Sequence, residues 1–293
     1  MRVTNSMIQT NATLALQNNL QAMAQAQNQV STGLKYSSFA DDPQAQSSVM
    51  QTSTSLNALT QYQRNISDAT ARANMEDTVL QQLTDTVTRA TAIATQQGTA
   101  TASAANRLAA KQEVDGLLNS AVSAGNTQYL GTYLFGGDNT TTAPVTSSPP
   151  FYSGTAPSGT HTTEISAGQL FKSNHNAKEI LLDTGTLQAL QNLSTALGNN
   201  DTAGIGTALT SLNSAQQGIQ SVVGDLGARE NQLQVTGSNI TALQSSLSTF
   251  KSSLSNVDQE KAITDLVTRQ TAYQSAMLAT SRVLGMTLTD YLK

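Results

Sequence analysis

Apolar residues occupy every seventh position through most of the C-terminal half of this chain, without a gap in the series. The series runs Ile205, Leu212, Ile219, Leu226, Leu233, Ile240, Leu247 and Leu254. Seven residues make almost two turns of an α-helix, so this spacing places one continuous apolar stripe along one side of a long helix. The stripe must be buried against another element, which favours a helical bundle or coiled coil.

A matching stripe lies in the N-terminal half. It consists of Leu59, Ile66, Ala73, Leu80, Val87 and Ala94, inside a proline-free run from Gln44 to about Gln97. At about 1.5 Å per residue both helices should be about 80 Å long. Rods of equal length bury their stripes along their whole length only side by side, so the two stripes predict an antiparallel pair of long helices.

Glycines interrupt the C-terminal helical pattern, and each costs a helix interior roughly 0.8–1 kcal/mol relative to alanine. They are Gly218, Gly224, Gly227 and Gly237. We expect a kink, or a close approach by another backbone, near the stretch VVGDLGARE (residues 222–230). Shorter helices are predicted at about 102–124 and about 186–198, where leucines recur at helical spacing. The four helices should share one core.

The middle of the chain has a different composition. Four of the five prolines and both histidines fall between Gly136 and Asn176, among many Gly, Ser and Thr residues, so a long helix is excluded there. The short runs YLGTYLF (residues 129–135) and EILLD (residues 179–183) are rich in residues that favour strands. The expected fold is therefore mainly α: a long antiparallel helical bundle or coiled coil formed by the N- and C-terminal segments, with a small β domain inserted in the middle.

The two ends of the chain carry similar apolar patterns. Val3 to Leu34 contains no charged residue and no proline, and the last segment, from Asp258 to Leu292, returns to a spacing of three and four. A helix facing bulk water normally carries more charge, so several faces of the N-terminal helix should meet other protein. We predict a partner interface formed by Leu16, Leu20, Met23, Val30, Leu34, Ile263, Leu266, Tyr273, Met277 and Leu284.

The composition excludes several classes of function. Charged residues make up 12% of the chain, against about 25% in an ordinary soluble domain. The net charge of −4 gives no basic field for phosphates, so nucleic acid is not an expected partner. Cysteine is absent, which removes disulfides, thiolate nucleophiles and cysteine-ligated metals. The N-terminus has no continuous apolar run, so we expect neither a cleaved signal peptide nor a membrane span.

The stretch STGLKYSSFADDPQAQSS, residues 31–48, separates two helical patterns and contains two adjacent carboxylates. Asp42 followed by Pro43 predicts a helix N-cap and first helical residue, because the carboxylate accepts a backbone N–H and proline lacks the donor that would be unpaired there. Asp41 adds a charge favourable to the helix dipole. The alternative, a catalytic carboxylate pair, lacks a neighbouring histidine or a second acidic cluster.

The two histidines allow a weaker hypothesis. His161 and His175 stand 14 residues apart with Glu164 and Glu179 nearby, so a metal site can be drawn among them. They lack the i, i+4 spacing of a helical histidine pair, so we predict neither a metal nor a cofactor.

Five motifs lie in order along nearly the whole chain: MRVTNSMI, QVSTGLKYSSFADDPQAQSS, YLFGGDNTTTAPV, VVGDLGARENQL and RQTAYQSAMLATSRVLGMTLTDYL. As a set they resemble the motifs of the flagellin superfamily. The resemblance is weakest from about Thr140 to Asp183. Within the superfamily the chain is more similar to the hook–filament junction proteins, the hook-associated protein 3 family, than to flagellin. In flagellin the joint typically continues Asp-Asp-Ala-Ala, whereas here Pro43 follows Asp42.

The resemblance implies a structural role without catalysis. It implies terminal coiled-coil helices lining an inner tube (1–40 with 256–293), a helical core domain (41–137 with 186–255) and a small outer β domain (138–185). It also implies a homo-oligomeric ring between hook-associated protein 1 and the flagellin filament. Export would use the flagellar type III apparatus with an export chaperone, which places the protein outside the cell in the flagellum.

Other functions stay open at this stage. A short flagellin that forms the filament itself would share the same motifs. A signalling coiled coil of the chemoreceptor type shares long heptads rich in Ala, Gln, Ser and Thr, but it usually needs a membrane span or a sensor domain. An enzyme built around the middle segment would have to use His161 and His175.

Overall fold

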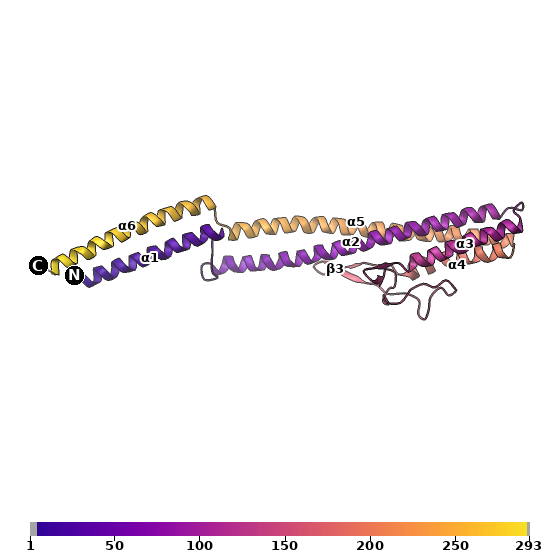
Figure 1. Cartoon of the computed structure of the whole chain (residues 1–293), viewed down its shortest axis with the longest axis horizontal. Helices are drawn as coiled ribbons and strands as arrows, with labels where there is room; N and C mark the ends of the chain where they lie inside the picture. The colour runs from indigo at the N-terminus through magenta and orange to yellow at the C-terminus, as the bar shows by residue number, and fades with distance from the viewer. Residues whose placement is uncertain (1–4, 292–293) are drawn as a thin grey trace. The chain divides into compact units, whose positions relative to one another are not determined.

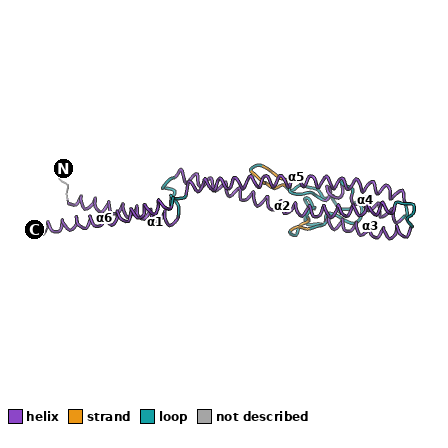
Figure 2. The backbone as a smooth tube through the Cα atoms, turned by 90° about the horizontal axis from the view of Figure 1, so that it is seen from above, coloured by secondary structure: helices purple, strands orange, loops and turns teal. Residues whose placement is uncertain are grey.

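The structure is a computed structural model that describes residues 5–291, except for the side chains of residues 5, 6, 8, 9 and 283–291. Most of the described chain is helical, and the strands form short hairpins (Figure 2). The elements are α1 (Asn5–Thr32), α2 (Pro43–Gln97), α3 (Ala104–Gly125), β1 (Gln128–Tyr129), β2 (Thr132–Tyr133), β3 (Thr162–Ser166), β4 (Gln169–Lys172), the π-helical turn η1 (Lys178–Leu182), α4 (Thr186–Gly198), α5 (Thr202–Ser255) and α6 (Gln259–Tyr291). This confirms the expected mainly α fold with small strands in the middle.

The chain packs as two compact units. One contains residues up to 58 together with those from 243 onward, and the other contains residues 59–242. This division reflects packing within a single chain, whereas the expected division into 1–40 with 256–293, 41–137 with 186–255, and 138–185 concerns layers of an assembly. The three-part organisation therefore stays a prediction.

The heptad stripes of α2 and α5 form the centre of the 59–242 unit. Every stripe residue from Leu59 to Ala94 and from Ile205 to Ile240 is buried, as the spacing predicts. The two helices run antiparallel, since Gly98 near the end of α2 lies beside Ile205 while Ile66 lies beside Gly237 (Figure 1). Buried side chains of α3 and α4 join the same cluster, which confirms that four helices share one core.

A buried arginine closes the end of this unit where α2, α3 and the α4–α5 turn meet. Arg107 of α3 donates from Nε to the Gln97 carbonyl (3.0 Å) and from Nη2 to the Thr99 carbonyl (2.8 Å). Its Nη1 donates to Oδ1 of Asn200, which lies in the turn before α5. The carbonyl of Gln97, the last residue of α2, has no partner within its own helix, so Arg107 supplies the donor that it lacks.

The expected close backbone approach near residues 222–230 does not occur at Gly224 or Gly227, whereas the expected kink stays a prediction. Helix α5 runs unbroken from Thr202 to Ser255. A Cβ atom added at Gly224 or Gly227 would meet nothing within 4 Å. The close approach occurs earlier in the helix, at Gly218, where a Cβ would lie 3.1 Å from the Thr184 side chain.

The segment between α3 and α4 contains two separate hairpins. Strands β1 and β2 pair antiparallel, with Gln128 opposite Tyr133, and β3 pairs with β4, with Thr162 opposite Lys172. The first hairpin turns through Leu130 (φ +51°) and Gly131 (φ +79°). Positive φ at both central residues matches the right-handed twist of the flanking strands.

The expectation of a strand at EILLD is wrong. Lys178–Leu182 forms the π-helical turn η1, with Ile180 and Leu181 buried in the core. A short apolar run does not distinguish a buried strand from a buried helical turn, because its periodicity is the same in both readings. The backbone N–H of Ala177 donates to the Phe135 carbonyl (2.8 Å) and so fixes the start of this turn.

The joint between α1 and α2 has the predicted cap. Helix α2 begins at Pro43, and Oδ1 of Asp42 accepts a hydrogen bond from the backbone N–H of Ala45 (2.9 Å). Oδ2 of Asp41 accepts from the backbone N–H groups of Ser37 (2.8 Å) and Ser38 (2.9 Å). Asp41 therefore closes the turn that precedes the helix, a role that its sequence position did not reveal.

Removing the Asp42 carboxylate should fray the start of α2. We expect Asp42→Ala to speed amide hydrogen exchange at Ala45 and in the next turn, with a local loss of about 1 kcal/mol. Asp42→Asn is the matched control, because its side-chain oxygen still accepts the Ala45 N–H. Equal exchange in the alanine and asparagine variants would contradict the cap.

Candidate assembly interface

Helices α1 and α6 lie side by side and antiparallel within their unit (Figure 1). Backbone hydrogen bonds join the end of α1 to the start of α6: the N–H of Val257 donates to the Gly33 carbonyl (2.9 Å), and that of Lys35 to the Ser255 carbonyl (2.7 Å). Nζ of Lys35 also donates to the Ser253 carbonyl (2.7 Å). These contacts fix which faces of the two helices meet.

Part of the predicted interface lies in this helix pair. Leu16, Met23, Val30, Leu266 and Tyr273 are half-buried. The most buried side chains of the pair are Ala26 and Ala262, which are 3% and 4% exposed. Each alanine stands four residues before a predicted residue, Val30 or Leu266, so the heptad spacing could have found them. A search for large apolar side chains passed over them.

The other predicted residues lie elsewhere. Leu20, Leu34, Ile263 and Met277 are exposed, and the side chain of Leu284 lies outside the described residues. The structure therefore does not bring all ten residues onto one seam. Contact of these residues with a partner protein stays a prediction.

The exposed apolar residues of α6 lie along its side. We call Ile263, Val267, Met277 and Leu278 the outer stripe; their exposed fractions are 51%, 56%, 49% and 63%. At about 100° per residue, Ile263, Val267 and Leu278 fall on a face roughly a quarter to a half turn from Ala262, Leu266 and Tyr273, and Met277 lies between the two faces. Helix α6 thus has one apolar face against α1 and a second one without a partner among the described residues.

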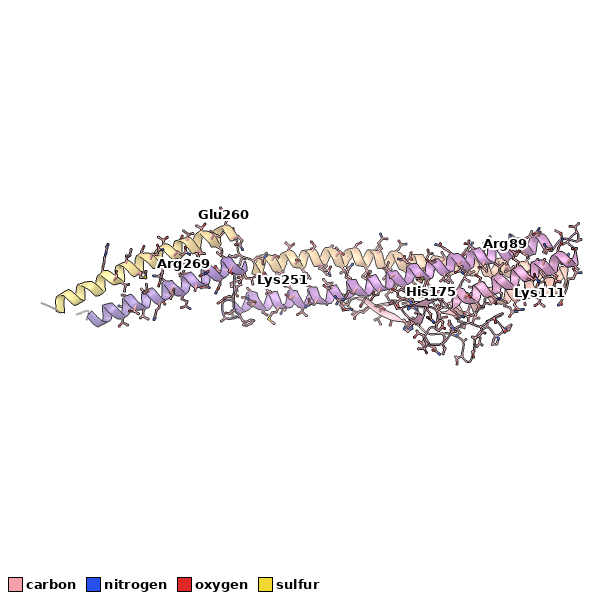
Figure 3. All side chains as sticks on the ribbon, viewed as in Figure 1. Arg89, Lys111, His175, Lys251, Glu260 and Arg269 are labelled. Carbon is pink, nitrogen blue, oxygen red and sulfur yellow. The ribbon has the colours of Figure 1, made fainter. Side chains whose placement is uncertain are left out.

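Charge is unevenly distributed over this helix pair. Helix α1 has no charged residue, and the charges of α6 gather mainly in its first three turns, where Glu260 and Arg269 lie (Figure 3). Nε of Arg269 lies 3.3 Å from Oδ1 of Asp265 in an exposed i, i+4 pair. Ile263 and Val267 lie in these charged turns, whereas Met277 and Leu278 lie in the stretch 270–281, which carries no charged residue. Burial of the exposed half of each side chain of the outer stripe would contribute about 1 kcal/mol.

A second apolar surface of the same unit lies at the joint. Phe39 and Met50 are 56% and 61% exposed. With Ser47, Gln51, Thr54 and Ser55 they line an open groove of about 620 Å³. No charged side chain lines it, which matches the low charge of α1.

The residues of the hypothetical metal site have separate partners. Nε2 of His161 lies 2.7 Å from the Gly137 carbonyl, and Oε1 of Glu164 accepts from the backbone N–H of Gly168 (2.9 Å). Glu179 pairs with Lys172 (2.8 Å). His175 lies between two other carboxylates. Among the side chains that the structure describes, no three from His, Asp or Glu are arranged to hold a metal ion.

Among the residues that the structure describes, none of the helices has the length and apolarity to span a bilayer.

Comparison with known proteins addresses the family directly. The family model of the bacterial flagellin N-terminal helical region matches residues 3–140, and that of the C-terminal helical region matches residues 205–292. No curated protein matches the chain.

Solved structures share the fold. A flagellar hook-associated protein of Vibrio parahaemolyticus is 21% identical, with a TM-score of 0.68 over 74% of this chain and 100% of that chain. FlgL of Bacillus cereus is 23% identical (TM-score 0.60; 68% and 97%). The flagellar hook-associated protein-3 of Legionella pneumophila is 15% identical (TM-score 0.63; 70% and 98%). Both flagellin helical regions are matched in chain order and together span most of the sequence, so this protein belongs to the flagellin family.

Proposed function

We propose that this protein is a structural adaptor of the bacterial flagellum that joins the hook to the flagellin filament and polymerises through its terminal helices. The observation that carries the proposal is the contrast between the two units. Residues 59–242 contain a core of fully buried Leu, Ile, Val and Phe side chains. In α1 and α6 the buried side chains among those described are alanines, Ala26 and Ala262, and the outer stripe and Leu20 stay exposed. Neighbouring subunits would cover these side chains.

Partner subunits would also explain the unusual surface of the terminal pair. A pair of helices of this length gains limited stability by itself, because helix formation in water is marginal without tertiary packing. Burial of the outer stripe on assembly would supply the missing packing. The alanines at positions 26 and 262 let the two helices approach closely, which leaves their other faces free for neighbours.

The proposed partners follow from the family. The protein would form a homo-oligomeric ring, bind hook-associated protein 1 on one side and flagellin on the other, and be carried by an export chaperone to the flagellar type III apparatus. Its place would be outside the cell. It would act by binding alone, without a metal, a cofactor or a catalytic step.

Two observations favour a junction protein over a filament subunit. The similar solved structures from Vibrio parahaemolyticus, Bacillus cereus and Legionella pneumophila are named as hook-associated proteins or FlgL. The Asp42–Pro43 cap also matches the joint of the junction proteins. A short flagellin is the second candidate, because both matched family models are those of flagellin.

A deletion strain separates the two candidates. Cells without the junction protein should keep their hooks, release unpolymerised flagellin into the medium and lose motility, and the wild-type gene should restore filaments. In wild-type cells an antibody against residues 138–185 should label only the base of each filament in electron micrographs. Label along the whole filament would instead identify a flagellin, and a motile deletion strain with normal filaments would contradict both candidates.

A further inference from the structure

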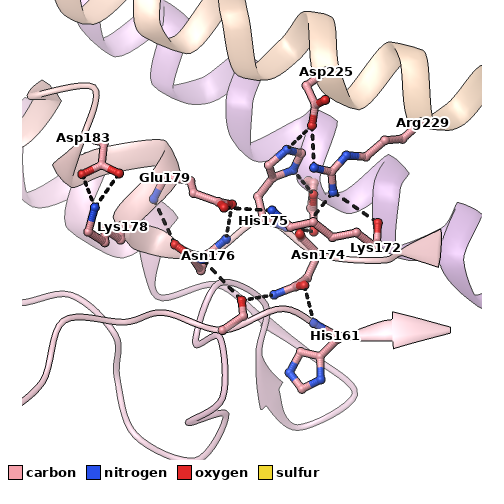
Figure 4. A network of polar contacts seen from close by, with 12 residues as sticks. His161, Lys172, Asn174, His175, Asn176, Lys178, Glu179, Asp183, Asp225 and Arg229 are labelled. Atoms are coloured by element: carbon pink, nitrogen blue, oxygen red, sulfur yellow. Dashed lines mark hydrogen bonds and ion pairs between the residues drawn. The ribbon is translucent and has the colours of Figure 1, made fainter. Parts of the chain in front are cut away.

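One buried histidine connects the segment between α3 and α4 to both long helices. His175 lies between β4 and η1 and is 4% exposed. Its Nδ1 lies 2.9 Å from Oε2 of Glu76 in α2, and its Nε2 lies 3.0 Å from Oδ2 of Asp225 in α5 (Figure 4). All three residues belong to the 59–242 unit, so the contact does not depend on how the terminal helices assemble.

The two carboxylates differ in their other partners. The Glu76 side chain is 2% exposed, and besides the ring it has the backbone N–H of His175 (3.3 Å) and Nε of Arg72 at 3.7 Å. The Asp225 side chain is 53% exposed and has Nη2 of Arg229 at 2.6 Å. Asp225 can therefore lose its contact with the ring, bind water instead and keep its ion pair with Arg229. Glu76 is buried and has no cation as close, so it cannot replace the ring in this way.

Other charged groups complete the surroundings of the ring. They are Arg72 from α2, Arg229 from α5, Lys172 from β4 and Glu179 from η1. Nη1 of Arg229 also donates to the carbonyls of Lys172 (3.2 Å) and Asn174 (3.3 Å), so the same part of α5 binds the backbone on both sides of Ser173.

The number of ring protons decides whether both contacts can form. A carboxylate oxygen only accepts hydrogen bonds, so two contacts need an N–H on each ring nitrogen, and only the imidazolium has both. Burial raises the pKa of Asp225, but the hydrogen bond from His175 and the charge of Arg229 outweigh burial, so this pKa lies below its ordinary value. Asp225 therefore keeps its negative charge to a more acid pH than an ordinary aspartate does.

We propose that His175 is a proton-operated latch, which fastens residues 162–182 to α5 when the ring is charged and releases them from Asp225 when it is neutral. The neutral ring keeps its single N–H on Glu76, the less exposed carboxylate, and turns a lone pair toward Asp225. Nε2 of the ring and Oδ2 of Asp225 are then both hydrogen-bond acceptors, so no hydrogen bond forms between them. Because the charged ring makes the link, the link is present at acid pH and is lost as the pH rises.

Hydrogen exchange of the full-length protein between about pH 5 and pH 8, where an imidazole changes charge, tests the latch. After correction for the intrinsic effect of pH on exchange, protection of residues 162–182 should fall about tenfold from the acid to the neutral end, as expected for one lost charge-assisted hydrogen bond. NMR of the imidazole rings should show the same midpoint for His175. The chain has two histidines, so a His161→Gln variant assigns the signals.

Variants separate the latch from other effects of pH. Asp225→Asn should remove the pH dependence and keep the segment protected at the neutral end, because the amide of asparagine can donate to the neutral ring. His161→Gln changes the other histidine, which directly precedes the segment, and should behave like wild type. The proposal is overturned if protection in the wild type does not change with pH. It is also overturned if the Asp225→Asn variant still loses protection as the pH rises, or if the His161→Gln variant keeps its protection.

Discussion

Replacement of Val267 and Leu278 by aspartate should abolish motility and leave the 59–242 unit as stable as in the wild type. Both residues belong to the outer stripe and are more than half exposed, so the isolated chain loses little packing. In an assembly the two carboxylates would be buried against a neighbouring subunit. Buried charges without partners are strongly unfavourable, so the variant should not enter the flagellum.

Two measurements check this expectation together. Thermal unfolding followed by circular dichroism should give the wild-type midpoint, while swarming assays and electron micrographs should show loss of motility and filaments. The matched control is Thr268→Asp with Ala279→Asp, which has the same eleven-residue separation on another exposed face of α6. Normal filaments from the Val267 and Leu278 variant would refute the assignment of the outer stripe to an interface.

Leu212→Ala should lower the free energy of unfolding by about 2–5 kcal/mol, because it leaves a cavity in the shared core. Leu212 is fully buried on the heptad stripe of α5. Packing around it comes from several helices, so collapse of the site can recover only part of the lost contacts.

The control is the same substitution at an exposed leucine of the same unit. Leu108 of α3 is 56% exposed, and Leu108→Ala should change the free energy of unfolding by less than about 0.5 kcal/mol. Urea unfolding of both variants measures the difference. Similar midpoints for the two variants would mean that the heptad stripe does not form the core.

The sequence predicted the fold through its regular spacings. The stripes containing Leu80 and Leu212 could be recognised because one position recurs every seven residues and a helix turns that repetition into a face. The Asp42–Pro43 cap was recognisable for a similar reason, since both residues affect only the backbone within a few residues along the chain. Structure set by local or periodic rules was therefore predictable.

Contacts between distant segments were not predictable in the same way. Nothing near His175 in the chain indicates that its ring meets Glu76, which is 99 residues away. Likewise, the apolar residues of EILLD could be buried in a strand or in a helical turn. Only their contacts with the surrounding core determine which of the two forms. The small segment between α3 and α4 has few repeats, so its hairpins depend on contacts that a single sequence does not display.

The candidate interface was partly predictable for an additional reason. A spacing of three and four does not say which apolar residues face α1 and which lie beside that contact, so Leu266 and Ile263 were placed on one seam although only Leu266 is half-buried. Val267 and Leu278 fall on a second, shifted apolar pattern of the same helix. A single template for the face against α1 does not find this second pattern.

Arg107 has a consequence for how the 59–242 unit responds to a rise in pH. A guanidinium keeps its charge over the whole range in which an imidazole loses it. The closure that Arg107 makes between Gln97, Thr99 and Asn200 uses no ring proton, unlike the contact of His175 with Asp225. A rise from about pH 5 to pH 8 should therefore loosen the hairpin segment first, while Arg107 still holds the ends of the helices together.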